Sequence, residues 1–325
     1  MIFFYAFGIV LKRRIGWRRF TSLYILTGVI SSLVSGAIPV LFLQELEQGI
    51  GASGAISGIM GVFAVRLFFK RLVFPVPLGF FSFILPVYLK IRVNSLCVMA
   101  MYFCRDLAGA MLTLSGEVTG IGYWAHVGGA VAGIILGLRL GYQDRAIEDK
   151  YTEKGLAALE DETRVAEGTS LLARALELNP ENETALLALA RRKSWPQPSE
   201  EGLTLYQRFI RLTIEKAPER AAEVFIEYFP LYRVPFEPSL QFRLAETLHR
   251  YGWVDAAAHA LQAIVDDPTT PAQWLQRSLF RLAKFLEEVG LKEAARIRYE
   301  QLLERFPEFP EGEYVRHKIK ILSCP

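Results

Sequence analysis

Cysteine is scarce in this sequence, with three in 325 residues. Cys97 and Cys104 lie in an apolar run and Cys324 lies next to the C-terminus, so the sequence has no C-x-x-C pair and no regular cysteine framework. A disulfide scaffold and a structural metal site are therefore not expected. The sequence also contains no motif that indicates a cofactor, so none is expected.

Charge is nearly absent from the first part of the chain. Residues 1–142 hold 12 Lys and Arg and 4 Asp and Glu, which leaves 25 and 30 for residues 143–325. So long a stretch with so few charges, divided into apolar runs, is neither a solvated globular domain nor a disordered one. We therefore predict that residues 1–142 lie in a lipid bilayer. The remainder has an ordinary soluble composition and is predicted to form a second domain.

The loops between the apolar runs differ in charge. Loops 44–50 and 115–121 carry acidic residues and no Lys or Arg, whereas the other loops are basic. Because basic residues concentrate in cytoplasmic loops, these two loops are predicted to face outside and residues 143–325 to lie in the cytoplasm. We expect the membrane to be a bacterial inner (plasma) membrane. The apolar runs cover residues 1–11, 21–43, 51–69, 94–114 and 122–142.

The first apolar run is too short to cross a bilayer. From Ile2 to Leu11 a helix rises only about 15 Å, which is roughly half of the hydrocarbon thickness. No basic leader or cleavage site precedes this run. We therefore expect in-frame sequence upstream of Met1 that encodes a further spanning helix.

Two polar clusters stand at the external ends of apolar runs. One surrounds Ser53 in the segment 51–58, and the other surrounds His126 in the segment 123–133. Helical rise places Ser53 and His126 at depths that differ by roughly 6 Å. A histidine in this position can take the serine's proton and make the hydroxyl a competent nucleophile.

Each cluster also has a structural interpretation. A Gly-x-Ser-Gly segment is common at helix-packing faces, where the serine bonds to its own helix. His126 is the only histidine of residues 1–142, and an ionisable side chain inside a membrane favours a function over a structural role. Arg105 and Asp106 are interpreted as structural or snorkelling, each with its own polar partner, because adjacent residues do not face each other on a helix.

In this order the motifs resemble those of the rhomboid family of intramembrane serine proteases. The resemblance covers residues 1–142. It implies an all-α bundle of transmembrane helices, with Ser53 as nucleophile and His126 as general base and acid in a dyad that lacks an aspartate. It also implies that the backbone N–H groups of Ala52 and Ser53 line an oxyanion hole, and that the substrates are transmembrane segments of other proteins. The resemblance rests on Gly51-Ala52-Ser53-Gly54, on Ala125-His126-x-Gly128-Gly129 with Gly133, and on the segment from Phe7-Gly8 to Arg19-Phe20 with Tyr24 and Gly28.

The sequence departs from the family pattern at several positions. Three family features do not occur in this sequence, and we expect them upstream of Met1: a His-x-x-x-Asn element that completes the oxyanion hole, the first family helix and the loop after it. Lys12 stands where an acidic residue is usual, and Ser57 where some members have a tyrosine that packs on the histidine. Each lost oxyanion donor costs about 10²–10³ in rate, so low activity is one expectation for this chain.

The polar part of the chain shows a helical repeat. A charged connector is predicted at 143–152 and a repeat domain at 153–325. The segment from Phe242 matches the segment from Phe280 at a shift of 38, and each reads as a helix–turn–helix that resembles a degenerate tetratricopeptide repeat. Such repeats usually bind proteins or peptides, so we expect a protein partner, or alternatively a passive anchor. The histidines of this half, His249, His259 and His317, have no ligand or triad spacing.

The sequence therefore predicts an intramembrane serine endopeptidase fused to a soluble α-helical repeat solenoid. The lipid bilayer and transmembrane proteins are its expected partners, and nucleic acid is not. The alternative is an inactive membrane scaffold that recruits partners through its repeats. Ser53 and His126 discriminate between the two, since a scaffold needs neither.

Overall fold

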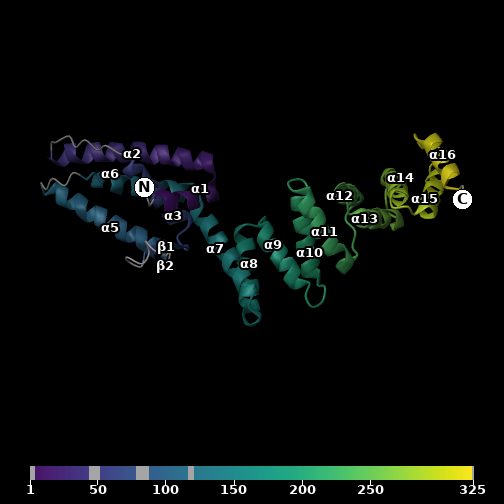
Figure 1. The fold of residues 1–325 in the computed structure, drawn as a ribbon, viewed down its shortest axis with the longest axis horizontal. Coiled ribbons are helices and arrows are strands. Elements are labelled where there is room, and N and C mark those ends of the chain that lie inside the picture. The colour runs from purple at the N-terminus through teal and green to yellow at the C-terminus, as the bar shows by residue number, and fades with distance from the viewer. Residues whose placement is uncertain (1–3, 44–51, 78–87, 116–120, 324–325) are drawn as a thin grey trace. The chain divides into compact units, whose positions relative to one another are not determined.

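The computed structural model describes residues 4–43, 52–77, 88–115 and 121–323. It is almost entirely helical, which confirms the expected all-α fold class. The chain divides into two compact units, Met1–Lys154 and Gly155–Pro325 (Figure 1). The predicted external loop 44–50 and most of the loop 115–121 lie outside the described residues.

The first unit contains the apolar helices. Trp17–Phe42 and Ser95–Leu114 are each long and apolar enough to cross a membrane, and Tyr123–Arg139 with Tyr142–Leu159 forms a third, bent candidate with an angle of 74°. Ser53–Arg66 is a shorter apolar helix. The elements are a π-helix at Phe4–Gly8, α1 (Ile9–Ile15), α2 (Trp17–Leu43), α3 (Ser53–Arg66), β1 (Arg71–Pro77), β2 (Tyr88–Asn94), α5 (Ser95–Leu114), α6 (Tyr123–Arg139) and α7 (Tyr142–Leu159).

Local sequence explains several boundaries in this unit. Gly16 adopts a φ of 80°, which separates α1 from α2. The Asn94 side chain accepts a hydrogen bond from the Leu96 N–H and so caps the start of α5. The basic segment before α5 pairs β1 with β2 in an antiparallel hairpin, with Arg71 opposite Asn94. The hairpin was not predicted, because the charge pattern of this segment indicates only a loop.

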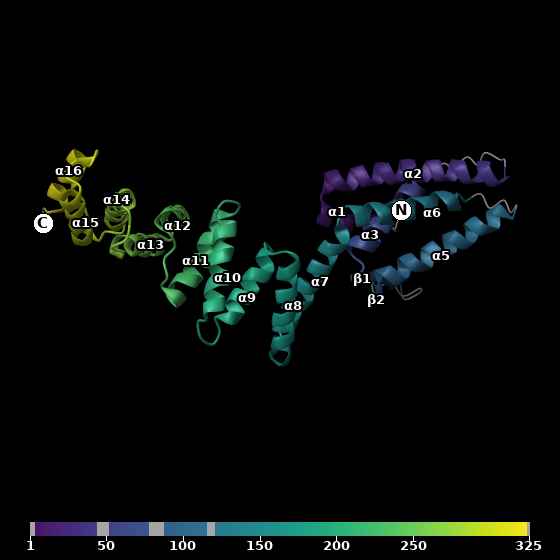
Figure 2. The same cartoon turned by 180° about the vertical axis from the view of Figure 1, so that it is seen from behind.

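Helix α3 packs against α6 and α2, which lie side by side in both views of the fold (Figures 1 and 2). Glycines make this contact possible. A Cβ atom at Gly129 would lie 2.1 Å from the carbonyl oxygen of Gly54, and one at Gly133 would lie 2.0 Å from that of Gly58. The backbones of α3 and α6 therefore touch, which only glycine permits.

The segment predicted as a charged connector (143–152) forms the first part of α7, and the acidic side chains Asp149 and Glu153 of α7 pair with basic side chains on α1, at the end of α3 and just after it. Arg66 is buried, and its Nη1 lies 2.7 Å from Asp149 Oδ2. Arg14 pairs with both Asp149 and Glu153, at 3.3 Å and 2.7 Å, and Lys70 also pairs with Glu153. A buried arginine requires such partners.

The second unit consists of helices that each pack on the next along the chain. This nearest-neighbour pattern is typical of helical repeats. Its core is built from large apolar side chains such as Phe209, Phe225 and Leu244. The helices are α8 (Val165–Leu178), α9 (Glu183–Lys193), α10 (Glu200–Thr213), α11 (Pro218–Tyr232), α12 (Pro238–Arg250), α13 (Val254–Asp266), α14 (Ala272–Glu288), α15 (Lys292–Arg305) and α16 (Gly312–Leu322).

The two segments related by a shift of 38 adopt the same helix–turn–helix. Gly252 and Gly290 have φ values of 85° and 81° and occupy equivalent turns. In each turn the N–H group after the glycine bonds back to a leucine carbonyl: Trp253 to Leu248 at 2.9 Å, and Leu291 to Leu286 at 2.8 Å. This is the Schellman arrangement that ends a helix in a glycine.

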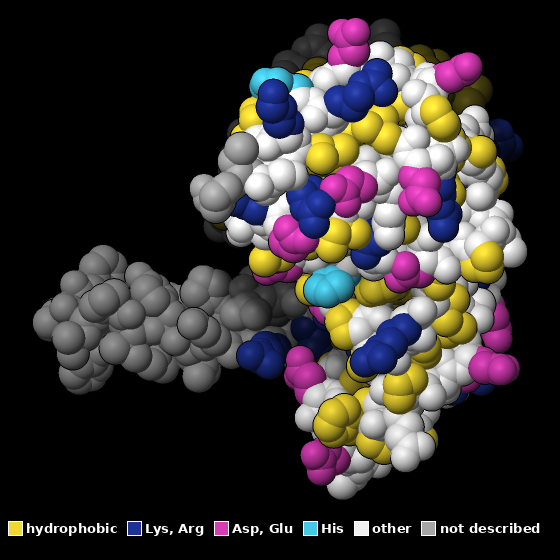
Figure 3. All heavy atoms as spheres, turned by 90° about the vertical axis from the view of Figure 1, so that its right-hand side faces the viewer, with side chains coloured by type: hydrophobic (Ala, Val, Ile, Leu, Met, Phe, Trp, Pro, Cys, Tyr) yellow, Lys and Arg dark blue, Asp and Glu magenta, His cyan; other side chains and the backbone are white. Residues whose placement is uncertain are grey.

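The surface of the second unit mixes charges of both signs. The face seen in Figure 3 shows basic and acidic side chains interspersed among apolar ones, with no continuous patch of either sign. One of the histidines, His249, lies on Phe285 with ring centroids 4.1 Å apart and contacts Glu288 at 2.5 Å. These contacts give His249 a packing role.

Candidate active site

Ser53 is the first residue of α3. Ala52 occupies the N-cap position without a side-chain cap, and both residues are exposed. The N–H groups of the first helical turn have no acceptor within a helix, so they are available to a developing negative charge beside Ser53. Gly51, the first residue of the sequence motif, lies outside the described residues.

His126 lies in the first turn of α6. Its Nδ1 is 3.1 Å from Oδ2 of Asp106 on α5, and the His126 side chain is 15% exposed. The ring meets Tyr123 edge to face, with centroids 6.5 Å apart. A hydrogen bond of 2.8 Å from the Ser31 hydroxyl to the Ala125 carbonyl ties this turn to α2.

Asp106 is buried and pairs with the guanidinium of Arg105 and the imidazole of His126. Oδ2 faces His126, and Oδ1 accepts hydrogen bonds from Nη2 and Nε of Arg105, at 2.5 Å and 3.1 Å. The expectation that Arg105 and Asp106 would have separate partners was therefore wrong. The reason is the length of the arginine side chain, which reaches the neighbouring carboxylate although the two residues do not share a helix face.

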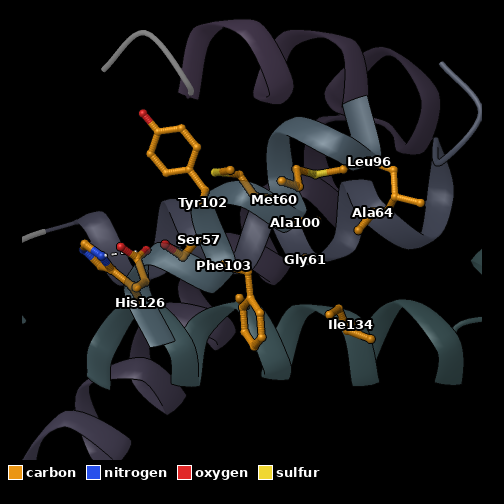
Figure 4. A pocket seen from close by; sticks show the side chains of 13 residues that line it. Ser57, Met60, Gly61, Ala64, Leu96, Ala100, Tyr102, Phe103, His126 and Ile134 are labelled. Carbon is orange, nitrogen blue, oxygen red and sulfur yellow. Dashed lines mark hydrogen bonds and ion pairs between the residues drawn. The ribbon is translucent and has the colours of Figure 1, made fainter. Parts of the chain in front are cut away.

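A cavity of about 180 Å³ lies beside His126 between three helices. Each helix contributes a stripe, that is, a set of side chains that lie on one face of the helix, and this face lines the cavity. Figure 4 shows Ser57 and His126 at one end of the cavity and Ile134 at the other. The stripes are Ser57, Met60, Gly61 and Ala64 on α3, Leu96, Met99, Ala100, Tyr102, Phe103 and Asp106 on α5, and His126, Ala130 and Ile134 on α6.

Ser53 does not line this cavity, and no hydrogen bond joins Ser53 to His126, both of which are described. Ser57 does line it, and residues four apart share a helix face. Ser53 therefore continues the stripe of α3 by one turn beyond Ser57. The backbone contact between Gly54 and Gly129 brings this end of α3 against the turn of α6 that follows His126.

Neither the site role of Asp106 nor the cavity was predicted from the sequence. The cavity's signal was present in the spacing of Leu96, Met99 and Phe103, which recur every three or four residues on α5. In the described part of the chain, no three His, Cys, Asp or Glu side chains come close enough together to hold a metal ion.

No curated protein matches the chain. Residues 1–143 match the model of the Rhomboid domain family, whose members are generally intramembrane proteases that act on transmembrane proteins. The matched region contains the apolar helices and the cavity beside His126. Residues 1–143 are thus similar to a Rhomboid domain, and together with the apolar helices this match supports an integral membrane protein.

Proposed function

We propose that the first unit is an intramembrane serine endopeptidase in which Ser53 is the nucleophile and His126 the general base and acid. The observation that carries the proposal is the contact between α3 and α6. It sets the N-terminus of α3, with Ser53, against the first turns of α6, with His126. The Rhomboid domain match over the same residues supports this assignment.

The reaction proceeds in two stages. The Ser53 hydroxyl attacks the scissile carbonyl while its proton passes to His126, and the tetrahedral oxyanion lies at the N–H groups of Ala52 and Ser53. His126 then gives that proton to the leaving amine as the C–N bond breaks, which leaves an acyl ester on Ser53. A water molecule, deprotonated by His126, hydrolyses the ester and restores the serine.

The cavity fits a substrate that is itself membrane-embedded. Its lining is apolar except at the end where Ser57, Asp106 and His126 lie. An unwound transmembrane segment carries apolar side chains, which the cavity can take, and a peptide group that needs polar partners. The exposed first turn of α3, with Ser53 one turn beyond Ser57, offers those partners. We therefore propose the transmembrane segments of other proteins as the substrate class.

The competing function is a membrane scaffold whose repeat unit recruits partners. Reaction with a fluorophosphonate probe in detergent separates the two, because only an activated serine reacts. We expect labelling of the full chain, slowed in proportion to the oxyanion donors that the motif departures remove, and its loss in Ser53→Ala and in His126→Ala. Ser32→Ala is the matched control, since Ser32 is exposed on α2 and bonds to the Gly28 carbonyl of its own helix; its labelling should be unchanged.

Two results would count against the assignment. Labelling that persists in Ser53→Ala but disappears in Ser57→Ala would make Ser57 the nucleophile. Absence of labelling in the full chain, with the helical content of the first unit intact, would favour the scaffold.

A further inference from the structure

A carboxylate is buried in the apolar unit and takes no part in the proposed reaction. Asp106 is 6% exposed on a candidate transmembrane helix. A charged group in such a place is costly unless it is paired, and charged residues inside membranes usually serve a function. Its pairing with Arg105 alone does not account for its orientation, because the two carboxylate oxygens have different partners.

The chemistry of the second carboxylate oxygen, Oδ2 of Asp106, determines which nitrogen of His126 carries a hydrogen. An ionised carboxylate only accepts hydrogen bonds, so Nδ1 of His126 must carry the hydrogen. The neutral ring then has its lone pair on Nε2, the atom that a serine-activating base needs free. When Nε2 takes a proton, the carboxylate 3.1 Å from Nδ1 faces a full positive charge and stabilises it.

We propose that Asp106 is a positioning residue for His126, so that this chain works with a Ser–His–Asp arrangement instead of a dyad. The inference rests on the proposed function, in which His126 is the base. Asp106 acts through the imidazole: it selects the tautomer, fixes the ring on α6 and stabilises the imidazolium. Arg105 has an exposed side chain (57%) and occupies only the other oxygen, so it holds Asp106 without reaching His126.

The tautomer of His126 can be read without any proteolytic activity. In the full chain labelled with ¹⁵N-histidine, the His126 signals are assigned by their loss in His126→Gln, since the chain has four histidines. The inference predicts that neutral His126 is protonated on Nδ1. Asp106→Asn should move the proton to Nε2, because the amide offers an N–H to Nδ1. Protonation on Nε2 in the unaltered chain would overturn the inference.

The rate of probe labelling at Ser53 gives the second readout. Asp106→Asn should slow labelling by about 10²-fold or more with little change in the probe concentration that gives half-maximal rate. Asp106→Glu should recover part of the loss, because a carboxylate is restored. Arg105→Gln, the matched control, should change the rate by less than about threefold, because a carboxylate alone keeps the tautomer.

The two failures are distinguishable. Labelling that survives Ser53→Ala would reject the proposed function. Full-rate labelling in Asp106→Asn, together with loss of labelling in Ser53→Ala, would reject the role of Asp106 and leave a dyad.

Discussion

The two units bury their helices by opposite means. In the first, α3 and α6 meet through bare glycine backbone, as at Gly54 against Gly129 and Gly58 against Gly133. In the second, the helices meet through large rings: Tyr206 of α10 contacts Tyr228 of α11 with centroids 6.1 Å apart, and Phe280 of α14 contacts Tyr299 of α15 at 6.4 Å. Helices in one chain are therefore joined in two ways, by backbone contact at glycines in the first unit and by aromatic side chains in the second.

The solvent explains this difference. In water, burying an aromatic ring removes a large apolar area from solvent, so big side chains stabilise the contact. In lipid, the surroundings are as apolar as the side chains, so helices associate through close packing and polar contacts. The glycines of the first unit have a further consequence, because close backbones also bring short polar side chains such as those of Ser53 and Ser57 near α6.

The largest effect that follows from this comparison is loss of a ring from the second unit. Phe225 is 1% exposed, and Phe225→Ala should destabilise the second unit by about 3–5 kcal/mol. Urea unfolding of the full chain in detergent, followed by circular dichroism, measures it. Leu231→Ala on the same helix is the control, since Leu231 is 45% exposed and should cost less than about 1 kcal/mol. Equal effects would mean that the rings do not carry the core.

Addition of a single methyl group should lower the stability of the first unit almost as much as Phe225→Ala lowers that of the second. In Gly133→Ala the new Cβ would lie 2.0 Å from the Gly58 carbonyl oxygen, and neither backbone can yield without separating α3 from α6. We expect a loss of about 3 kcal/mol and slower labelling of Ser53. Thermal unfolding in detergent checks the first effect.

Gly36→Ala is the matched control for this substitution. Gly36 lies on α2, and a Cβ there has no atom within 4 Å. That variant should be as stable as the unaltered chain or slightly more so, because alanine favours a helix. If Gly133→Ala were equally harmless, the helices of the first unit would not depend on backbone contact.

Apolar runs, the repeat and the site were predictable to different degrees. The runs at 21–43 and 94–114 predicted α2 and α5 because membrane helices need length and hydropathy, which sequence states directly. The shift of 38 predicted α12 to α15 because each copy carries its own turn glycine. The contact of Asp106 with His126 was not predictable, since it depends on how α5 and α6 pack across 20 intervening residues. Nor could spacing alone show that Ser57, and not Ser53, lines the cavity.

The smallest effect concerns the ionisable groups that each unit buries. The first unit buries charged side chains, those of Asp106 and Arg66, and the second unit buries neutral phenols such as that of Tyr206, which is 2% exposed. Burial raises the pKa of Tyr206 to about 12. Below pH 10 the phenol is protonated in both the folded and the unfolded chain, so it has no effect on the pH dependence there.

Between pH 10 and about 12 the unfolded chain releases the Tyr206 proton while the folded chain keeps it. The folded state therefore loses stability as the pH rises through this window, by about 1–2 kcal/mol from this residue at pH 11. Urea unfolding at pH 8 and pH 11 should show a smaller alkaline loss for Tyr206→Phe than for the unaltered chain. Tyr251→Phe is the control, because Tyr251 is 39% exposed. An equal alkaline loss in Tyr206→Phe and the unaltered chain would show that the phenol of Tyr206 does not carry this burial cost.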